Sequence, residues 1–195
     1  MADGIIKFET DVAVVEFKSI AKGMFVTDAM LKSAQVSLVL ATTLCPGKYL
    51  TIVAGGTSAV EKAVDTADRL GGRDVFSSFV ISAINSEIID AISGKIEGQL
   101  NDSIGIIESL HMANIMNAAD ISLDSAEVRI VEFRLGKGCG VNSFYIITGE
   151  LAAVEEATKN AVLFLSENGS LIAFRVIANP DSDLLRWLEP SMCAC

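Results

Sequence analysis

The chain contains an internal duplication, in which residues 14–89 are echoed block by block in residues 106–185. The offset between the repeats is 92 at Ser33-Ala34-x-Val36 and 94 at Ala59-Val60-Glu61-x-Ala63. The second repeat therefore holds two extra residues, which we place between Val131 and Ile146. Insertions collect in loops because a loop has no ladder of hydrogen bonds to disrupt. A duplication that differs mainly in one loop predicts a repeated scaffold with specialised loops.

The repeat divides the 195 residues into two predicted domains of roughly 90 residues, a size that supports a single core. We expect the first domain over residues 11–93, a polar linker over 94–102, the second domain over 103–189 and a short tail over 190–195.

Hydrophobic periodicity predicts the same order of elements in each repeat. The first repeat shows strands over 12–17, 36–43, 49–53 and 75–84, a helix carrying Ile20, Met24 and Leu31, a helix from about residue 57, and a short helix over 87–92. The second shows strands over 104–108, 128–133, 144–148 and 171–178, a helix carrying Met112, Ile115, Met116, Ala119 and Leu123, and helices over 152–165 and 183–188. The order β-α-β-β-α-β is the ferredoxin-like arrangement, so we expect an α/β (α+β) fold.

Composition excludes several classes of protein. Apolar residues make up 51% and the mean hydropathy is +0.47, yet no stretch reaches the ~18–20 apolar residues of a membrane span. Residues 1–7 lack the basic and apolar build of a signal peptide, so we expect a cytoplasmic protein that does not bind membranes. The net charge of −10 argues against nucleic acid. We expect the excess apolar surface to be buried between subunits.

The four cysteines lack the even spacing of a disulfide framework, which indicates thiols or metal ligands. Cys45 lies in a predicted turn, Cys45-Pro46-Gly47-Lys48, although a lone cysteine is more often a small buried hydrophobe. Cys139 lies in the matching loop of the second repeat. Cys193 and Cys195 have a spacing that can chelate a soft metal, but a terminal position is more typical of two exposed thiols.

The sequence shows no catalytic constellation. His111 is the only histidine and has no partner recognisable in the sequence. The glycines at 136, 138 and 140 lack P-loop spacing and a following helix start. We therefore predict that the chain is not an enzyme.

Three segments carry a resemblance to a known family: Ser19-Ile20-Ala21-Lys22-Gly23-Met24, Asp28-Ala29-Met30-Leu31-Lys32-Ser33-Ala34 and Cys45-Pro46-Gly47-Lys48. They resemble bacterial microcompartment shell proteins, in particular the tandem-domain, trimer-forming class and its PduT type from propanediol-utilisation compartments. The resemblance covers nearly the whole chain, and its motifs fall in the unpermuted order.

This resemblance implies a homotrimer whose six domains imitate a hexamer. Such pseudohexameric tiles pack edge to edge with other shell proteins around an enzyme cargo, within the cytoplasm. The loops between the second and third strands of each domain would surround a central pore. The implied pore-lining residues are Pro46, Gly47, Lys48, Lys137, Gly138, Cys139 and Gly140.

The PduT-type resemblance also implies a cofactor: one [4Fe-4S] cluster per trimer, held by Cys45 from each of three chains. Three thiolates supply all but one of the usual four protein ligands. The cluster would transfer electrons across the shell, with encapsulated redox enzymes as partners, or deliver iron and sulfur to cargo. For Cys139 we favour a packed thiol in a glycine-rich turn over a second cysteine ring.

Two other functions stay open at this point. One is a cluster-free shell tile whose pore conducts small polar metabolites. The other is a ferredoxin-like regulator that binds a small ligand between subunits.

The last expectation concerns the tile edge. Lys32 matches the lysine that shell proteins of this family carry at the edge, but the second repeat has Asp124 at that position. The arginine-containing turn common after the last strand is also replaced, by Asn85-Ser86 and Asn179-Pro180-Asp181. We expect edges of the first repeat to prefer edges of the second repeat or of a partner shell protein.

Overall fold

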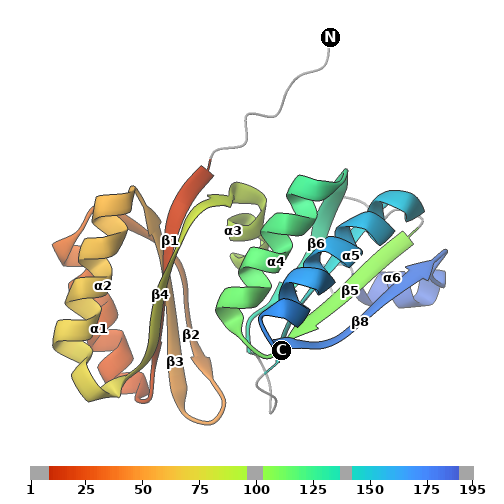
Figure 1. Cartoon of the computed structure of the whole chain (residues 1–195). Helices are drawn as coiled ribbons and strands as arrows, with labels where there is room; N and C mark the ends of the chain where they lie inside the picture. The colour runs from red at the N-terminus through yellow and green to blue at the C-terminus, as the bar shows by residue number, and fades with distance from the viewer. Residues whose placement is uncertain (1–8, 96–102, 137–141, 189–195) are drawn as a thin grey trace. The chain divides into compact units, whose positions relative to one another are not determined.

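The computed structural model describes residues 9–95, 103–136 and 142–188 (Figure 1). They group into two compact units, Met1–Ser86 and Glu87–Cys195. Within the described ranges, no helix has the length and apolar character needed to cross a membrane.

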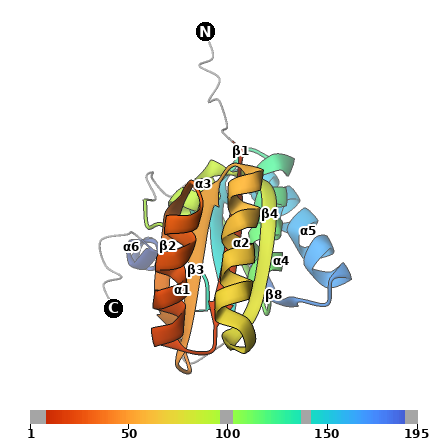
Figure 2. The same ribbon diagram turned by 90° about the vertical axis from the view of Figure 1, so that its left-hand side faces the viewer.

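The first unit is a four-stranded antiparallel sheet with two helices on one face (Figure 2). Its elements are β1 (Glu9–Phe17), α1 (Ile20–Ser33), β2 (Val36–Leu44), β3 (Lys48–Gly55), α2 (Thr57–Gly71), a 3-10 turn η1 (Gly72–Asp74) and β4 (Val75–Asn85). The strand order is β2-β3-β1-β4, which puts β2 at one edge.

The second unit repeats this plan, with strand order β6-β7-β5-β8 and β6 at the edge. Its elements are α3 (Ser86–Ile92), β5 (Ser103–Ser109), α4 (Met112–Ser125), β6 (Val128–Arg134), β7 (Ser143–Gly149), α5 (Leu151–Glu167), β8 (Leu171–Ala178) and α6 (Ser182–Leu188). The predicted α+β fold with two tandem domains is confirmed. Helix α3 is the last element of the first repeat, yet it groups with the second unit. The boundary at residue 93 therefore stays a prediction.

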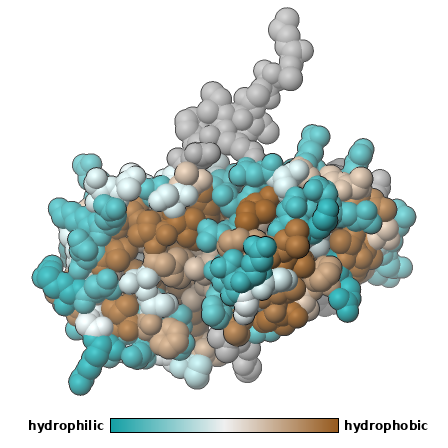
Figure 3. Space-filling model, viewed as in Figure 1, coloured by the Kyte–Doolittle hydropathy of each residue, from teal (hydrophilic) through white to brown (hydrophobic). Residues whose placement is uncertain are grey.

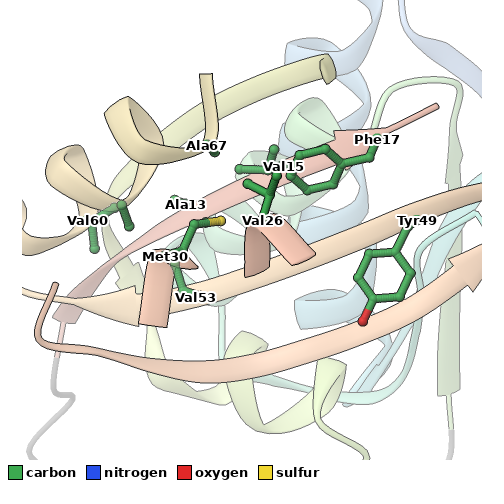
Figure 4. Packing of buried hydrophobic residues seen from close by; sticks show 10 residues of the cluster. Ala13, Val15, Phe17, Val26, Met30, Tyr49, Val53, Val60 and Ala67 are labelled. Atoms are coloured by element: carbon green, nitrogen blue, oxygen red, sulfur yellow. The ribbon is translucent and has the colours of Figure 1, made fainter. Parts of the chain in front are cut away.

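The core of the first unit lies between its sheet and its two helices (Figure 4). Alternate residues of β1 point to the same face of a strand, so Ala13, Val15 and Phe17 share the helix side. Their partners are Val26 and Met30 on α1, Tyr49 and Val53 on β3, and Val60, Ala63 and Ala67 on α2. Full burial of a large apolar side chain stabilises a fold by about 1.5–3 kcal/mol.

Helix α1 approaches the sheet closely at Gly23. A Cβ atom built there would lie 2.6 Å from Cδ1 of Tyr49, so only glycine fits beside this ring. In the second repeat, Ile115 stands at the position of Gly23 and Ser143 at the position of Tyr49, so the large side chain is on the helix and the small one on the strand. Both residues are buried. Met24 lies in the predicted helix but off its buried face, and is half exposed.

The strand register locates the two extra residues of the second repeat. Thr42 of β2 pairs with Leu50 of β3, whereas Arg134 of β6 pairs with Phe144 of β7. The separation grows from 8 residues to 10, so the insertion lies between Arg134 and Phe144. It falls within the predicted interval, in the connection between two strands.

Both units leave large apolar side chains at the surface. The most exposed include Phe25, Met24, Phe76, Leu163, Leu38 and Leu184. Figure 3 shows brown apolar surface gathered in patches among polar side chains. Apolar surface that gathers in patches marks interaction sites more often than isolated apolar residues do.

Candidate functional site

Cys45 lies on the tight turn that joins β2 to β3, at the lower end of the first unit in Figure 1. Its side chain is exposed and forms no disulfide. Gly47 has φ +72°, a conformation that favours glycine, and the space at its missing Cβ is open. Leu44 and Lys48 pair directly across the base of the turn. The predicted turn is therefore present, and it presents a thiol away from the core.

Lys48 fixes the strand that follows the turn. Its Nζ donates to Oε1 of Glu16 on β1 at 2.6 Å and lies 3.6 Å from the ring centroid of Phe76 on β4. The Glu16 side chain is only 7% exposed and that of Lys48 22%. A pair that is mostly removed from water is held more firmly than a surface pair. The Lys48 ammonium is thus engaged on the sheet, and its predicted place in a pore lining stays a prediction.

Among the described residues, one chain does not bring together a complete set of metal donors. Across the described ranges, no group of three or more His, Cys, Asp or Glu side chains is placed to hold an ion. Cys45 offers one soft donor on an open turn, with Pro46 and Gly47 beside it. An exposed thiolate suits a soft metal or an iron–sulfur group, provided that further thiolates come from other chains. Cys45 and its described neighbours therefore fit a site shared between chains.

The matching loop of the second repeat lies largely outside the described residues. The predicted pore residues Lys137, Gly138, Cys139 and Gly140 are outside the described residues. So are Cys193 and Cys195, which belong to the tail. At the start of the loop, the Gly136 N–H donates to Oγ of Ser143 at 3.2 Å, and Gly136 has φ +53°. A glycine-requiring turn therefore opens this loop.

Tyr145 lies on β7, the strand that follows the second loop, and is fully buried. Its ring stacks on Phe133 with the centroids 5.7 Å apart, and its hydroxyl lies 2.7 Å from Oγ of Ser122. The hydroxyl donates to the carbonyl oxygen of Ala118 at 3.1 Å. Burial raises the pKa of Tyr145 above its ordinary value, and the hydrogen bond to Ser122 offsets part of the shift. Tyr145 is a structural element of the second unit rather than a reactive group.

The two predicted edge residues occupy equivalent places in different surroundings. Lys32, in the last turn of α1, has its Nζ 2.6 Å from Oδ2 of Asp28, and both side chains are mostly exposed. Asp124, in the last turn of α4, lines an open groove between α4 and α5 together with Ile121, Ser125, Asn160, Leu163, Phe164 and Glu167. The groove therefore carries two carboxylates, whereas the first unit has a lysine at the position of Asp124.

Sequence reasoning missed the support of the Cys45 turn. Glu16 is a carboxylate within an apolar strand, where an ionised group needs a partner, and that was the available signal. The partner Lys48 lies on the neighbouring strand and Phe76 on the strand beyond. The lone histidine, His111, precedes α4, and its backbone N–H donates to Oγ of Ser109.

Comparison with known proteins connects this geometry to a family. The model of the BMC domain matches residues 11–84 and again residues 103–180. The chain is 33% identical over 177 residues to the bacterial microcompartment shell protein PduT of Citrobacter freundii, covering 91% of this chain and 96% of that protein.

A more distant relative and a solved structure also match most of this chain. The carboxysome assembly protein CcmO of Synechococcus elongatus is 28% identical over 178 residues, with 84% of this chain and 63% of that protein covered. A crystal structure of a microcompartment protein from Desulfitobacterium hafniense DCB superposes with a TM-score of 0.88 at 35% identity, covering 92% of this chain and 99% of that one.

Proposed function

Because this chain belongs to the BMC-domain family of bacterial microcompartment shell proteins, we propose that three copies of it form a closed tile with one iron–sulfur cluster at its centre. The family membership itself makes the chain a structural, non-enzymatic component of the microcompartment shell, similar to PduT. As a shell protein it forms oligomers that assemble with other shell proteins. The trimer, the cluster and their residues form our proposal.

A three-fold tile explains the incomplete donor set. Closed rotational symmetry is the common state of homo-oligomers, and a duplicated domain in a trimer gives six similar units around the axis. If the β2–β3 turns face the axis, three Cys45 thiolates meet there, while Pro46 and Gly47 surround them. The observation that carries the proposal is the exposed Cys45 thiol on a turn anchored by the Lys48–Glu16 pair.

The proposed cluster is [4Fe-4S], one per trimer, with three Cys45 ligands and one non-protein ligand. When bound, it supplies one-electron redox chemistry at the centre of the tile, which suits electron transfer across the shell to encapsulated redox enzymes. Cys45 would hold the group, and residues 46–48 beside it would line the centre and close it to metabolites. The loop that contains Lys137, Gly138, Cys139 and Gly140 would contribute the second half of the pore lining.

Lys32 and Asp124 belong to the same proposal as residues of the tile edge. Lys32 is a cation on the last turn of α1, and Asp124 is an anion on the equivalent turn of α4. Opposite charges at equivalent places favour contacts between unlike edges. We therefore place first-repeat edges against second-repeat edges or against a partner shell protein.

The experiment is anaerobic purification followed by reconstitution with iron and sulfide. The wild-type protein should show broad visible absorption, with about four irons per three chains. Cys45→Ser should lose this absorption and keep its oligomeric mass, because a hydroxyl is a poor iron ligand of nearly the same size.

The double variant Cys193→Ser/Cys195→Ser is the matched control, since it removes thiols that the proposal does not use. Full iron content in Cys45→Ser would overturn the assignment of the ligand. A colourless wild-type protein that still assembles into sheets would favour the cluster-free tile with a metabolite pore. A protein that forms no sheets and binds a small ligand would favour the regulator.

A further inference from the structure

Helix α3 shows how the end of one repeat attaches to a neighbouring unit. It belongs to the first repeat in sequence but groups with the second unit. Oε1 of Glu87 accepts a hydrogen bond from the backbone N–H of Ile130 on β6 at 2.6 Å. In the same helix Ile88, Ala91 and Ile92 are buried. Helix α3 thus bonds the β6 backbone through a carboxylate and carries buried apolar side chains next to it in sequence.

The receiving surface is the edge strand β6. Of its buried residues, Phe133 stacks on Tyr145 and Val131 clusters with Ile104 and Ile146, whereas Ile130 is the residue whose N–H meets Glu87. Ile130 is 3% exposed. It directly precedes the irregularity in the register between β6 and β7.

The second repeat ends in an equivalent helix, α6. Ala83 and Asn179 have positive φ angles of 55° and 51° at an offset of 96, so the two chain segments turn in the same way before their helices. The same offset makes Leu184 the counterpart of Ile88. Ile88 is 0% exposed, whereas Leu184 is 44% exposed. Helix α6 thus presents the apolar position that α3 buries.

Another side of α6 packs against its own unit. Leu185 packs against the cluster of Ile104, Val131 and Ile146 in its own unit. The counterpart of Glu87 is Asp183, which retains a carboxylate one methylene shorter and pairs with Arg186 at 3.0 Å on the surface. Leu184 therefore projects from a helix whose position is fixed on its other side.

The first unit also has a counterpart of the receiving strand. Leu38 of β2 corresponds to Ile130 at an offset of 92, and it too directly precedes a register irregularity. Leu38 is 46% exposed. Each repeat thus has one terminal helix and one edge strand of this kind, and among the described residues Leu184 of α6 and Leu38 of β2 are exposed.

We infer that helix α6 of one chain docks on strand β2 of a second copy, with Leu184 packed against Leu38. The contact reproduces the arrangement of α3 on β6 between two separate chains. It joins two different surfaces, so it repeats from chain to chain and closes into a ring when the rotation allows. The inference rests on the proposed trimer and names the surfaces that hold it together.

Size-exclusion chromatography with light scattering tests the inference on the full chain. The wild type should have three times the 20.6 kDa chain mass. Leu184→Asp and Leu38→Asp should each reduce the mass about threefold, since each places a carboxylate in an apolar contact. Leu163→Asp is the matched control, because Leu163 is also a leucine at the surface, is 52% exposed on α5 and lies outside the contact. It should leave the mass unchanged.

Mixing the two variants sharpens the test. Leu184→Asp keeps an intact β2 and Leu38→Asp keeps an intact α6, so an equimolar mixture should form a dimer with one intact contact and no ring. Circular dichroism checks that both variants fold. Leu38→Ala is a milder change at an exposed edge position, and it should make the mass of the oligomer depend on protein concentration. Wild-type trimers whose Asp variants are also trimers would overturn this interface and leave the proposed tile standing. A monomeric wild type would instead overturn the tile.

Discussion

The Nζ atom of Lys48 lies 2.6 Å from Oε1 of Glu16, directly after the turn that carries Cys45. The pair joins β3 to β1, and Phe76 of β4 covers the ammonium group. The turn with the exposed thiol therefore rests on three adjoining strands of the sheet. In the proposed tile Cys45 meets two other thiolates on an axis, and a ligand in such a place needs a rigid support.

Lys48→Met should destabilise the first unit by roughly 3 kcal/mol, since it leaves the Glu16 carboxylate buried without its partner. Lys32→Met is the control, because Lys32 and Asp28 have the same separation but are exposed, and such pairs contribute only about 0.2–1 kcal/mol. Urea unfolding at one fixed chain concentration measures both. Equal losses in the two variants would contradict a supporting role for the Lys48–Glu16 pair.

Gly23→Ala should lower the free energy of unfolding by about 1–3 kcal/mol, because its Cβ would lie 2.6 Å from the Tyr49 ring. Tyr49→Ser removes that ring, so the double variant should be more stable than the sum of the two losses predicts, by at least about 0.5 kcal/mol. Gly56→Ala, at a position with open space, is the control. Strictly additive losses would show that the ring does not limit this helix–sheet approach.

The buried phenol of Tyr145 predicts a loss of stability in alkali. Its pKa is raised in the folded protein, so the folded state holds its proton above pH 10 while the unfolded state releases it. The contribution of Tyr145 to the free energy of unfolding is fully present below the ordinary pKa near 10. Above that pH it falls by up to about 1.4 kcal/mol per pH unit. Tyr145→Phe should lose stability less steeply between pH 9 and pH 11 in urea unfolding. Parallel pH profiles for the two proteins would contradict this.

The edge residues predict a charge-swap pattern in sheet assembly. Lys32→Asp and Asp124→Lys should each weaken homotypic sheets, and the double swap should restore them, because unlike edges then attract again. Each exposed pair is worth only about 0.2–1 kcal/mol, but the contact repeats around the tile. Electron microscopy over a series of protein concentrations gives the threshold for sheet formation. Identical thresholds for all four proteins would leave Lys32 and Asp124 as ordinary surface residues.

The sequence predicts the scaffold well because the information is local and present twice. The repeated blocks and their hydrophobic periods indicate the two domains. The shift in offset places the insertion between Val131 and Ile146, and the strand register narrows that interval to Arg134–Phe144. The turn at Cys45 follows from its proline and glycine.

Side-chain pairings across strands were not predictable in the same way. The partnership of Glu16 and Lys48 depends on the register between β1 and β3, and hydrophobic periodicity does not fix that register. In the described contact between α3 and β6, the backbone N–H of Ile130 donates to Oε1 of Glu87. A backbone N–H is present at every residue except proline, so no pattern of residue types points to it.

The most direct test of the shared cluster is anomalous diffraction at the iron edge from crystals of anaerobically purified protein. The account predicts one cluster of iron peaks centred on the three-fold axis of the tile, in which three irons each lie within bonding distance of Sγ of Cys45 from a different chain. Iron bound away from Cys45, or an axis without iron in protein whose iron content is full, would contradict it.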